Sequence, residues 1–396
     1  MHANEKSSQV ARMGEVYGCA REVLSFLASP SPETDDVLDQ VNKNFHTTIR
    51  EFSPSLFVGF FNLLTNEYWR RAWVFQELAM ATTISIHCGS RTTSLDAILA
   101  LLRRFNEMNV NAGFRGAING LRLLPHAKPL FSQWRKHGLT PTRKPPEYVT
   151  KRVYGTFLDV LRSSRGHYAC QDPRDMLYSR MALASDAAMM IPYPDYHMSV
   201  EELYKRFATN HIIITGSLDI VTFARNSALQ LPTWVPDWTS EDIGWHVDTT
   251  YNSLQDSLTL LSWSDIGLPR ISRCRSELMV QGRVLMTIQK HSIEALFTSA
   301  YSTLIRYAGS YPLSEVPRRG DFICVLRGCP LLVYLRAVGQ HFIVVGRHFV
   351  AHNKLSDPRL GLITTAETKD NYNHKTWSLT SVDAVQTRPE EVFRIQ

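Results

Sequence analysis

The sequence predicts an α/β protein: helices around a parallel sheet, then a helical segment, then a small β-rich C-terminal domain. Residues 66–108 contain a helical pattern, an alternating strand pattern and a second helical pattern, which is the succession of an α/β layer with a parallel sheet. From about residue 231, short alternating runs separated by glycine-containing turns replace the helical periodicity. This second pattern indicates a small antiparallel sheet or barrel.

The composition fits an ordinary folded protein. The chain has 396 residues, enough for two or three domains, with 44% hydrophobic and 20% charged residues. Intrinsic disorder would need fewer apolar residues and more net charge. The 43 basic and 37 acidic residues leave a charge of only +6 without a dense basic run, which favours a mixed solvated surface over a specific nucleic-acid site.

The cysteines and the start of the chain predict a cytoplasmic protein with no membrane partner. The six cysteines form no CxxC pair, and no signal-like segment opens the sequence, so reduced thiols are expected. The longest apolar runs, such as 56–61, are too short to span a bilayer.

The first predicted element is an amphipathic helix that ends near Ala28, before the Ser-Pro-Ser-Pro break at 29–32. Ser7 or Ser8 can cap it, and its apolar residues recur at three- and four-residue steps. These residues are Val10, Met13, Val16, Ala20, Val23, Leu24 and Leu27. A polar helix around 33–50 and a Phe-rich segment up to Leu64 follow.

The elements of the α/β layer come next. Residues 66–81 read as one helix with Trp69, Trp73 and Met80 on one side, and 94–108 as another helix. Between them, 82–88 alternates polar and apolar residues and stops at Gly89, so we predict a strand.

The middle of the chain is predicted to be helical after a break. Residues 111–150 are rich in glycine and proline and read as a linker or variable insertion, and 151–162 as a helix. Asp172 is expected to cap a further helix with Pro173 at its first position and Asp175 in its first turn.

Later elements follow from equally local signals. Ser199 and Glu202 form a capping box for a helix through Ala208, and 218–223 reads as a strand. Residues 231–238 contain two prolines and two tryptophans, which predicts an ordered but irregular segment. Strands are expected at 278–288, 320–326, 331–337 and 341–350, and a loose polar tail after them.

Several of these segments, in this order, resemble the fungal heterokaryon incompatibility (HET) domain family. The most specific is Trp69–Leu78, WRRAWVFQEL, which contains Trp69, Arg71 and Gln76. The other matching segments are 9–27, Asp172-Pro173-Arg174-Asp175 with Tyr178, 194–196, 231–238 with Trp234, Pro236 and Asp237, Gly320-Asp321 and 335–346. The resemblance implies a partial HET domain at 1–110, the linker at 111–150, a helical HET-associated region at 151–230, a β-rich domain at 231–355 and a polar tail at 356–396.

The sequence departs from the family pattern at its start. The HET domain opens with a strand ending in a Tyr-Trp-Gly-type motif and a second strand with a Trp-Ile-Asp…Cys-Ile-Asn-Gln-type block, and neither occurs here. We therefore expect an N-terminally truncated copy. The sequence leaves open whether the short start is biological or an error in the gene model. In an open α/β sheet, ligands bind at the carboxyl ends of such strands, so the truncation removes the expected pocket.

The resemblance also suggests a chemistry. HET domains are similar to TIR domains, which have a flavodoxin-like sheet, and some TIR proteins cleave NAD with a glutamate in a Trp-Cys-x-x-Glu-Leu pattern. Trp73, Glu77 and Leu78 have this spacing, with Val74 in place of the cysteine. Residues i and i+4 share a helix face, so the Trp73 ring is expected beside the Glu77 carboxylate. The hypothesis is that Glu77, supported by Trp73, is the catalytic residue of a nucleosidase with NAD as substrate.

Structural interpretations compete with this one. Glu77 can pair with Arg70 or Arg71, and Asp172, Arg174 and Asp175 can form a helix cap with an Arg–Asp brace. Asp195 and Asp237 follow prolines and are expected to bond local backbone amides. His87 and Cys88 point to opposite strand faces, while Cys324, Cys329, His341, His348 and His352 lack metal-ligand spacing, so no metal and no cofactor are predicted.

The resemblance implies a role in fungal nonself recognition and the associated programmed cell death. The chain would be an effector or a degenerate copy, without enzymatic activity in the truncated form, and its partner would be a second copy or a separate sensor protein. Two alternatives stay open: a TIR-like NAD- or nucleotide-cleaving nucleosidase using Glu77, and a binding-only or non-functional fragment.

Overall fold

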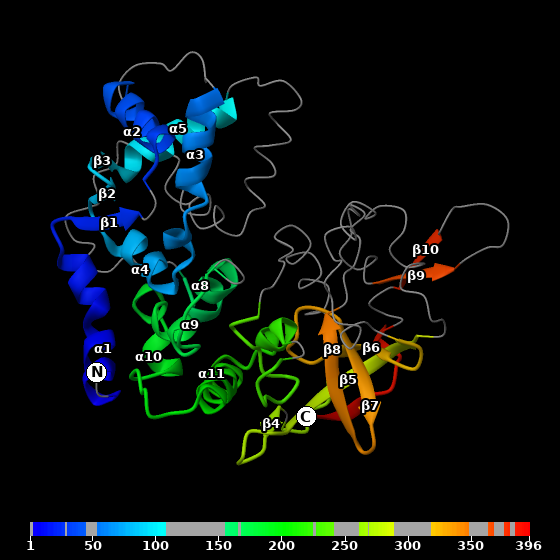
Figure 1. Cartoon of the computed structure of the whole chain (residues 1–396). Coiled ribbons are helices and arrows are strands. Elements are labelled where there is room, and N and C mark those ends of the chain that lie inside the picture. Colours follow the sequence, from blue (N-terminus) through cyan, green and yellow to red (C-terminus); the bar gives the residue numbers. More distant parts are fainter. Residues whose placement is uncertain are drawn as a thin grey trace. The chain divides into compact units, whose positions relative to one another are not determined.

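The computed structural model divides the chain into two compact units, residues 1–198 (unit 1) and 199–396 (unit 2), and each is described by itself (Figure 1). The structure describes residues 3–27, 30–44, 54–107, 155–164, 168–224, 227–240, 261–267, 269–288, 318–347, 363–367, 376–380 and 385–396. The predicted linker at 111–150 and the residues His348 and His352 lie outside these described residues.

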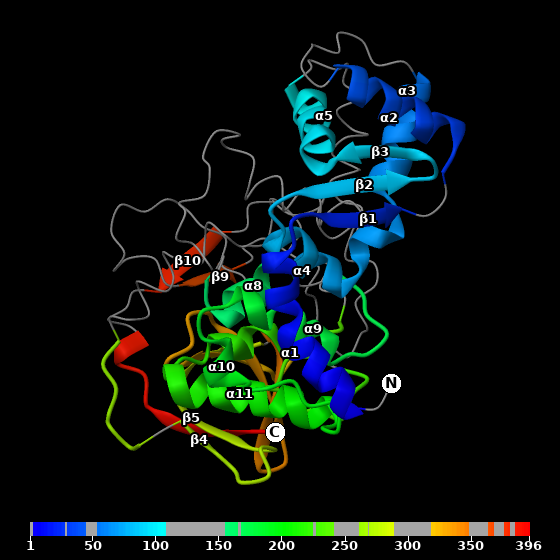
Figure 2. The same cartoon turned by 90° about the vertical axis from the view of Figure 1, so that its left-hand side faces the viewer.

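Unit 1 is built on a three-stranded sheet in the order β1 (Val23–Leu27), β2 (Ile84–Cys88) and β3 (Arg91–Ser94), whose strands lie side by side in Figure 2. β1 pairs with β2 in parallel, and β3 returns antiparallel after a turn at Gly89, whose φ of 58° favours glycine. The sheet is therefore mixed, with one parallel pair.

The helices of unit 1 come from both ends of its sequence. They are α1 (Ala3–Cys19), α2 (Pro32–Asn44), α3 (Pro54–Leu64), η1 (Glu67–Arg70), α4 (Ala72–Met80), α5 (Leu95–Glu107), α8 (Phe157–Ser164), α9 (Asp175–Tyr178), η2 (Met181–Leu183) and α10 (Ala187–Met190). The sheet shares one hydrophobic core with α2, α3 and α5, to which Leu38, Phe60, Trp69, Ile86 and Ile98 belong.

The first helix was predicted to be too long. In the structure α1 ends at Cys19, and the last part of the predicted helix forms strand β1 instead. Residues 23–27 alternate between buried and exposed, and they gain a full set of parallel backbone partners from 84–88. The helical spacing of Val23, Leu24 and Leu27 is overridden by this pairing, and Leu24 is 51% exposed.

The predicted helix 66–81 is interrupted at Arg71, whose backbone is extended (φ −64°, ψ 131°). Its neighbours pair with a segment a hundred residues later: Ala169 N donates to Arg70 O (2.6 Å) and Ala72 N donates to Ala169 O (2.9 Å). These bonds replace the intrahelical bonds that a continuous helix would make. Trp69 therefore lies in η1, not on one face with Trp73 and Met80.

Smaller corrections concern helix starts. α9 begins at Asp175 with Arg174 as its N-cap, so Asp172 is not the cap residue; its carboxylate instead accepts a hydrogen bond from Arg174 N (3.1 Å). The helix predicted at 151–162 corresponds to α8, which begins at Phe157. A separate difference is strand β3, which the sequence did not predict.

Unit 2 contains one long helix and a small barrel. α11 (Val200–Thr215) begins at Ser199, whose hydroxyl accepts from Glu202 N (3.1 Å), and it ends at Gly216 in the left-handed conformation (φ 67°). The predicted cap at Ser199 is thus present, but the Glu202 carboxylate pairs with Lys205 (3.2 Å) and Arg275. The helix runs seven residues beyond the predicted end at Ala208.

The barrel strands are β4 (Arg270–Ile271), β5 (Leu278–Thr287), β6 (Phe322–Leu326), β7 (Val333–Val338), β8 (His341–Arg347) and β11 (Glu391–Ile395). β5 to β8 form an antiparallel meander, and β11 pairs with both β8 and β5, which closes the ring. β9 (Ile363–Glu367) and β10 (Thr376–Thr380) form a separate antiparallel pair. The β-rich C-terminal region is confirmed.

Two predictions in unit 2 need correction. Residues 219–223 form a 3₁₀ helix, η3 (Asp219–Phe223), not a strand, because Asp219 bonds locally: its carboxylate accepts from Ile220 N (2.9 Å) and its carbonyl from the Thr222 hydroxyl (2.6 Å). The segment expected to be a loose tail contributes β11, whose Phe393 and Ile395 are fully buried.

Among the helices of the described ranges, none combines the length and apolar character that crossing a bilayer requires.

Closure of the barrel by β11 gives a stability prediction. Ile395→Ala should destabilise unit 2 by about 2–4 kcal/mol, because it empties a fully buried position. Val392→Ala on the same strand should change stability by less than about 0.5 kcal/mol, because Val392 is 47% exposed. Urea unfolding followed by circular dichroism checks both values, and equal effects would contradict the closed barrel.

Candidate functional site

The site predicted around Glu77 lies on α4, directly after the break at Arg71. The Glu77 side chain is half-buried, and hydroxyl groups from two other elements hold both of its oxygens. Tyr17 of α1 donates to Oε1 (3.1 Å) and Tyr68 of η1 donates to Oε2 (2.8 Å). The Tyr68 hydroxyl also lies 2.8 Å from Ser25 Oγ on the buried face of β1. The carboxylate therefore joins four elements.

The two tyrosines remain hydrogen-bond donors at any physiological pH. Burial and, next to it, the negative charge of Glu77 raise the pKa of both Tyr17 and Tyr68. The neutral hydroxyls then orient the carboxylate. The positive charge of Arg71 acts in the opposite direction on the pKa of both tyrosines, so this residue belongs to the same neighbourhood.

The residues before Glu77 in the same motif serve its placement. Trp69 is fully buried and its Nε1 donates to Leu63 O (2.7 Å), which anchors η1 in the core. Gln76 is also buried, and the amide orientation that satisfies both of its polar atoms has its nitrogen donating to Ser179 O (3.2 Å) and its oxygen accepting from Gly14 N (2.9 Å). The Arg71 side chain is exposed.

Trp73 faces a different group from the one expected. Its Nε1 donates to Asp175 Oδ2 (3.3 Å), so the ring is tied to the Asp172–Asp175 motif a hundred residues later. Asp175 is buried and also accepts a hydrogen bond from the Tyr196 hydroxyl. The structure thus brings together the two most specific sequence motifs of unit 1.

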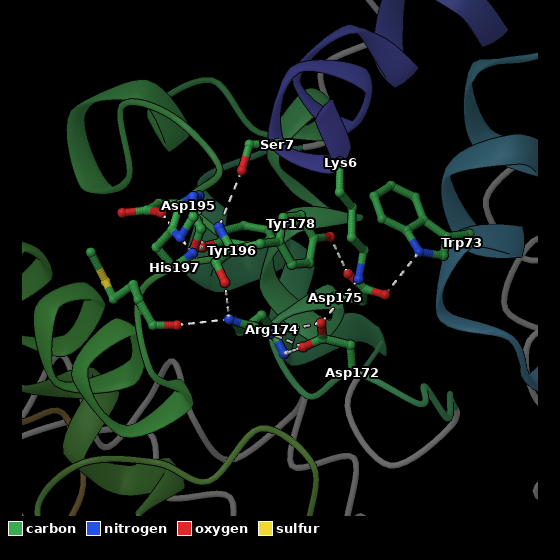
Figure 3. A network of polar contacts seen from close by, with 11 residues as sticks. Lys6, Ser7, Trp73, Asp172, Arg174, Asp175, Tyr178, Asp195, Tyr196 and His197 are labelled. Carbon is green, nitrogen blue, oxygen red and sulfur yellow. Dashed lines mark hydrogen bonds and ion pairs between the residues drawn. The ribbon is translucent and has the colours of Figure 1, made fainter. Parts of the chain in front are cut away.

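Figure 3 shows the polar network around Asp172 and Arg174. Arg174 binds Asp172 with two parallel hydrogen bonds, Nε to Oδ1 (2.9 Å) and Nη2 to Oδ2 (3.0 Å). Its Nη1 donates to the carbonyls of Tyr196 (2.6 Å) and Met198 (2.8 Å), and Lys6 of α1 adds an ion pair with Asp172 (3.0 Å). The Arg–Asp brace is therefore present, and the remaining Arg174 nitrogen holds the backbone of residues 196–198 in place.

Burial alone would raise the pKa of Asp172, but the hydrogen bonds from Arg174 and Lys6 overcome this effect and lower it to about 2. Lys6 also lies over the Tyr196 ring, 3.8 Å from its centroid. Asp195, as predicted, accepts from a local backbone amide, His197 N (2.8 Å).

The other predicted motif residues belong to unit 2. Trp234 is fully buried beneath an irregular segment, as the sequence indicated. Asp237 accepts from Thr239 N (2.9 Å) and from the Ser227 hydroxyl (2.6 Å), and Pro236 precedes it in the same buried turn. These contacts stabilise a turn.

Sequence reasoning missed the partners of these motifs. Tyr17 and Tyr68 are as decisive for Glu77 as the motif itself, and Lys6 completes the site of Asp172. No local signal connects them, because Tyr17 and Glu77 are 60 residues apart and Lys6 and Asp172 166 apart. Within the described ranges, no three His, Cys, Asp or Glu side chains form a group that could hold a metal ion.

Residues 1–77 match the family model described as heterokaryon incompatibility protein (HET). The matching segment includes α1, β1 and the motif up to Glu77, so the similarity to this family lies in the N-terminal part of the chain. No curated protein and no solved structure matches the chain.

The Arg174 geometry predicts a difference between two conservative variants. Arg174→Lys should destabilise unit 1 by about 2–3 kcal/mol, because an ammonium cannot form the paired bonds and also reach two carbonyls. Arg162→Lys should change stability by less than about 0.5 kcal/mol, because the Arg162–Asp159 pair is more exposed. Chemical unfolding of the two variants tests this, and equal midpoints would contradict it.

The lowered pKa of Asp172 predicts a pH dependence. Its hydrogen bonds stabilise the folded state fully above its ordinary pKa near 4, and this contribution is lost as the pH falls towards the folded value of about 2. Asp172→Asn should therefore lower stability at pH 7 by about 1–2 kcal/mol, solvent screening included, and by much less at pH 2. Glu67→Gln, at an exposed position, is the control for thermal unfolding between pH 2 and 7.

Proposed function

We propose that the chain acts in heterokaryon incompatibility, the nonself recognition of fungi, as an effector of the accompanying programmed cell death. The match of residues 1–77 to the HET family model carries this proposal. The segment that matches includes the most specific motif of the sequence, Trp69–Glu77, and ends at the candidate residue Glu77.

The packing of this motif favours a working domain over a non-functional fragment. Trp69 and Gln76 are buried with satisfied polar groups, and Trp73 and Glu77 have specific partners from distant segments. Each unpaired buried polar group costs about 1–3 kcal/mol, so the pairing of these groups within the motif fits a segment whose folding has been maintained. A partner is part of the proposal: a second copy of the chain or a separate sensor protein.

Glu77 favours a second candidate, a nucleosidase that cleaves NAD. Its carboxylate is half-buried and is oriented by two neutral hydroxyls. Glu77 also follows Trp73 at the spacing of the TIR pattern. In such a reaction the bond between nicotinamide and ribose breaks, and water adds to the ribose carbon and loses a proton. A carboxylate next to the ribose would stabilise the positive charge that develops on the sugar, as in glycosidases.

Expression in a filamentous fungus tests the first proposal. Induction of the full chain in a vegetative culture should reduce the viable fraction at least about tenfold over an uninduced culture, measured with a membrane-impermeant dye and by colony counts. Glu77→Gln should restore viability, while Glu67→Gln should kill like the original chain, because Glu67 is an exposed glutamate on the neighbouring η1.

The same cultures separate the two candidates. Death that depends on Glu77, together with falling NAD and release of nicotinamide by the purified chain, supports the nucleosidase. Death without NAD loss supports an effector that acts by binding. A chain that accumulates in folded form and leaves the cells viable, alone and in confrontation with incompatible strains, would refute the cell-death proposal.

A further inference from the structure

Helix α1 lies on unit 1 with a narrow, largely half-buried face of mixed polar and apolar residues, of which Tyr17 packs against the hydrophobic core. The residues of this face recur at three- and four-residue steps, and of them only Ser7 is buried, whereas the others are half-buried. They are Lys6, Ser7, Val10, Met13, Gly14 and Tyr17. On another side of the helix, Val16 is 55% exposed. The apolar area that α1 buries is therefore small, and so is the hydrophobic contribution to its attachment.

Polar contacts at both ends of α1 hold it in place. Near its start, Asn4 Oδ1 lies 2.7 Å from His197 Nε2, Lys6 pairs with Asp172 (3.0 Å), and the Ser7 hydroxyl accepts from Tyr196 N (3.2 Å). Figure 3 shows the last two contacts. Near its end, Tyr17 donates to Glu77 (3.1 Å). The Ser7 contact is buried, whereas the contacts of Asn4, Lys6 and Tyr17 are exposed or partly buried, and such contacts each contribute little net stability.

The centre of α1 fits only because it carries a glycine. A Cβ added to Gly14 would lie 2.4 Å from Ala182 Cβ of η2, closer than side-chain atoms approach each other. At Gly18, one turn later, the nearest atom to an added Cβ is Met80 Cε at 3.4 Å, an ordinary contact. The same substitution at these two positions should thus separate docking from helix formation.

The docked helix also covers the candidate site. Tyr17 supplies one of the two hydroxyls on Glu77, and the other comes from Tyr68 of η1, which is anchored by Trp69 in the core. Detachment of α1 would remove the Tyr17 ring and free Oε1, while Tyr68 would keep its bond to Oε2.

We infer that α1 is a detachable strap that controls access to Glu77. The strap opens as a separate element while the sheet β1–β3 remains folded, because few apolar contacts tie it to the rest of unit 1. This inference deepens the proposed function by giving its site a closed and an open state. It concerns the molecule alone, so its test does not depend on cell death or NAD cleavage.

Hydrogen exchange of the full chain, read by mass spectrometry, measures the opening. In the original chain, amides 4–19 should exchange at least about tenfold faster than those of β2 (Ile84–Cys88), through an opening that needs no global unfolding. Gly14→Ala should accelerate α1 exchange by a further factor of about ten, although alanine favours the helix itself. Gly18→Ala is the matched control and should not accelerate it.

Carbodiimide labelling of carboxylates reads access to Glu77 in the same samples. Gly14→Ala should raise the labelling of Glu77 several-fold relative to exposed Glu67, whereas Gly18→Ala should leave the ratio unchanged. Tyr17→Phe, which removes the hydroxyl without adding volume, should also raise it. This variant keeps the test meaningful if Gly14→Ala folds poorly.

Two outcomes would overturn the strap. One is α1 and β2 exchanging at the same rate in the original chain, because the helix would then open only with the whole unit. The other is Glu77 labelling that stays constant in both Gly14→Ala and Tyr17→Phe. If the strap opens as inferred but induced cells survive, the cell-death proposal fails and the strap stands.

Discussion

The pairing of Arg70 and Ala72 with Ala169 determines the arrangement of the candidate site. These two backbone hydrogen bonds hold Arg71 extended, which ends η1 and restarts the chain as α4 in a new direction. Since side-chain directions on a helix are fixed by its axis and phase, this one break aims Trp73 at Asp175 and leaves Glu77 within reach of Tyr17 and Tyr68. A continuous helix through 66–81 would orient the same residues differently.

Next to this break, polar contacts position the side chains of unit 1. Arg174 donates hydrogen bonds to one carboxylate and two backbone carbonyls. Asp175 accepts hydrogen bonds from both Trp73 and Tyr196. Such networks fix a geometry because each donor has a direction, whereas apolar contacts tolerate sliding. They contribute little net stability per contact, which is consistent with the strap inferred for α1.

Local signals explain which predictions were right. The helix cap at Ser199, the strand ending at Gly89 and the turn at Asp237 depend on neighbours within a few residues, so the sequence carries them in full. At 219–223 the local bonds of Asp219 decided against the predicted strand, but in two other places a distant segment supplied the competing bonds. The 84–88 strand turned 23–27 from helix to strand, and Ala169 broke the helix at Arg71.

The sequence by itself determined the α/β class, the β-rich C-terminal region and the similarity of residues 1–77 to the HET family, because hydrophobic periodicity and ordered motifs can be recognised within short stretches of sequence. It also singled out Glu77, Trp73 and the Asp172–Asp175 motif. Only the tertiary structure decided what these residues touch: Tyr17 reaches Glu77 across 60 positions and Lys6 reaches Asp172 across 166. In the same way, β11 closes the barrel by pairing with β5, which lies more than a hundred residues earlier. Contacts at such separations depend on how whole elements pack, and no window of the sequence contains both partners.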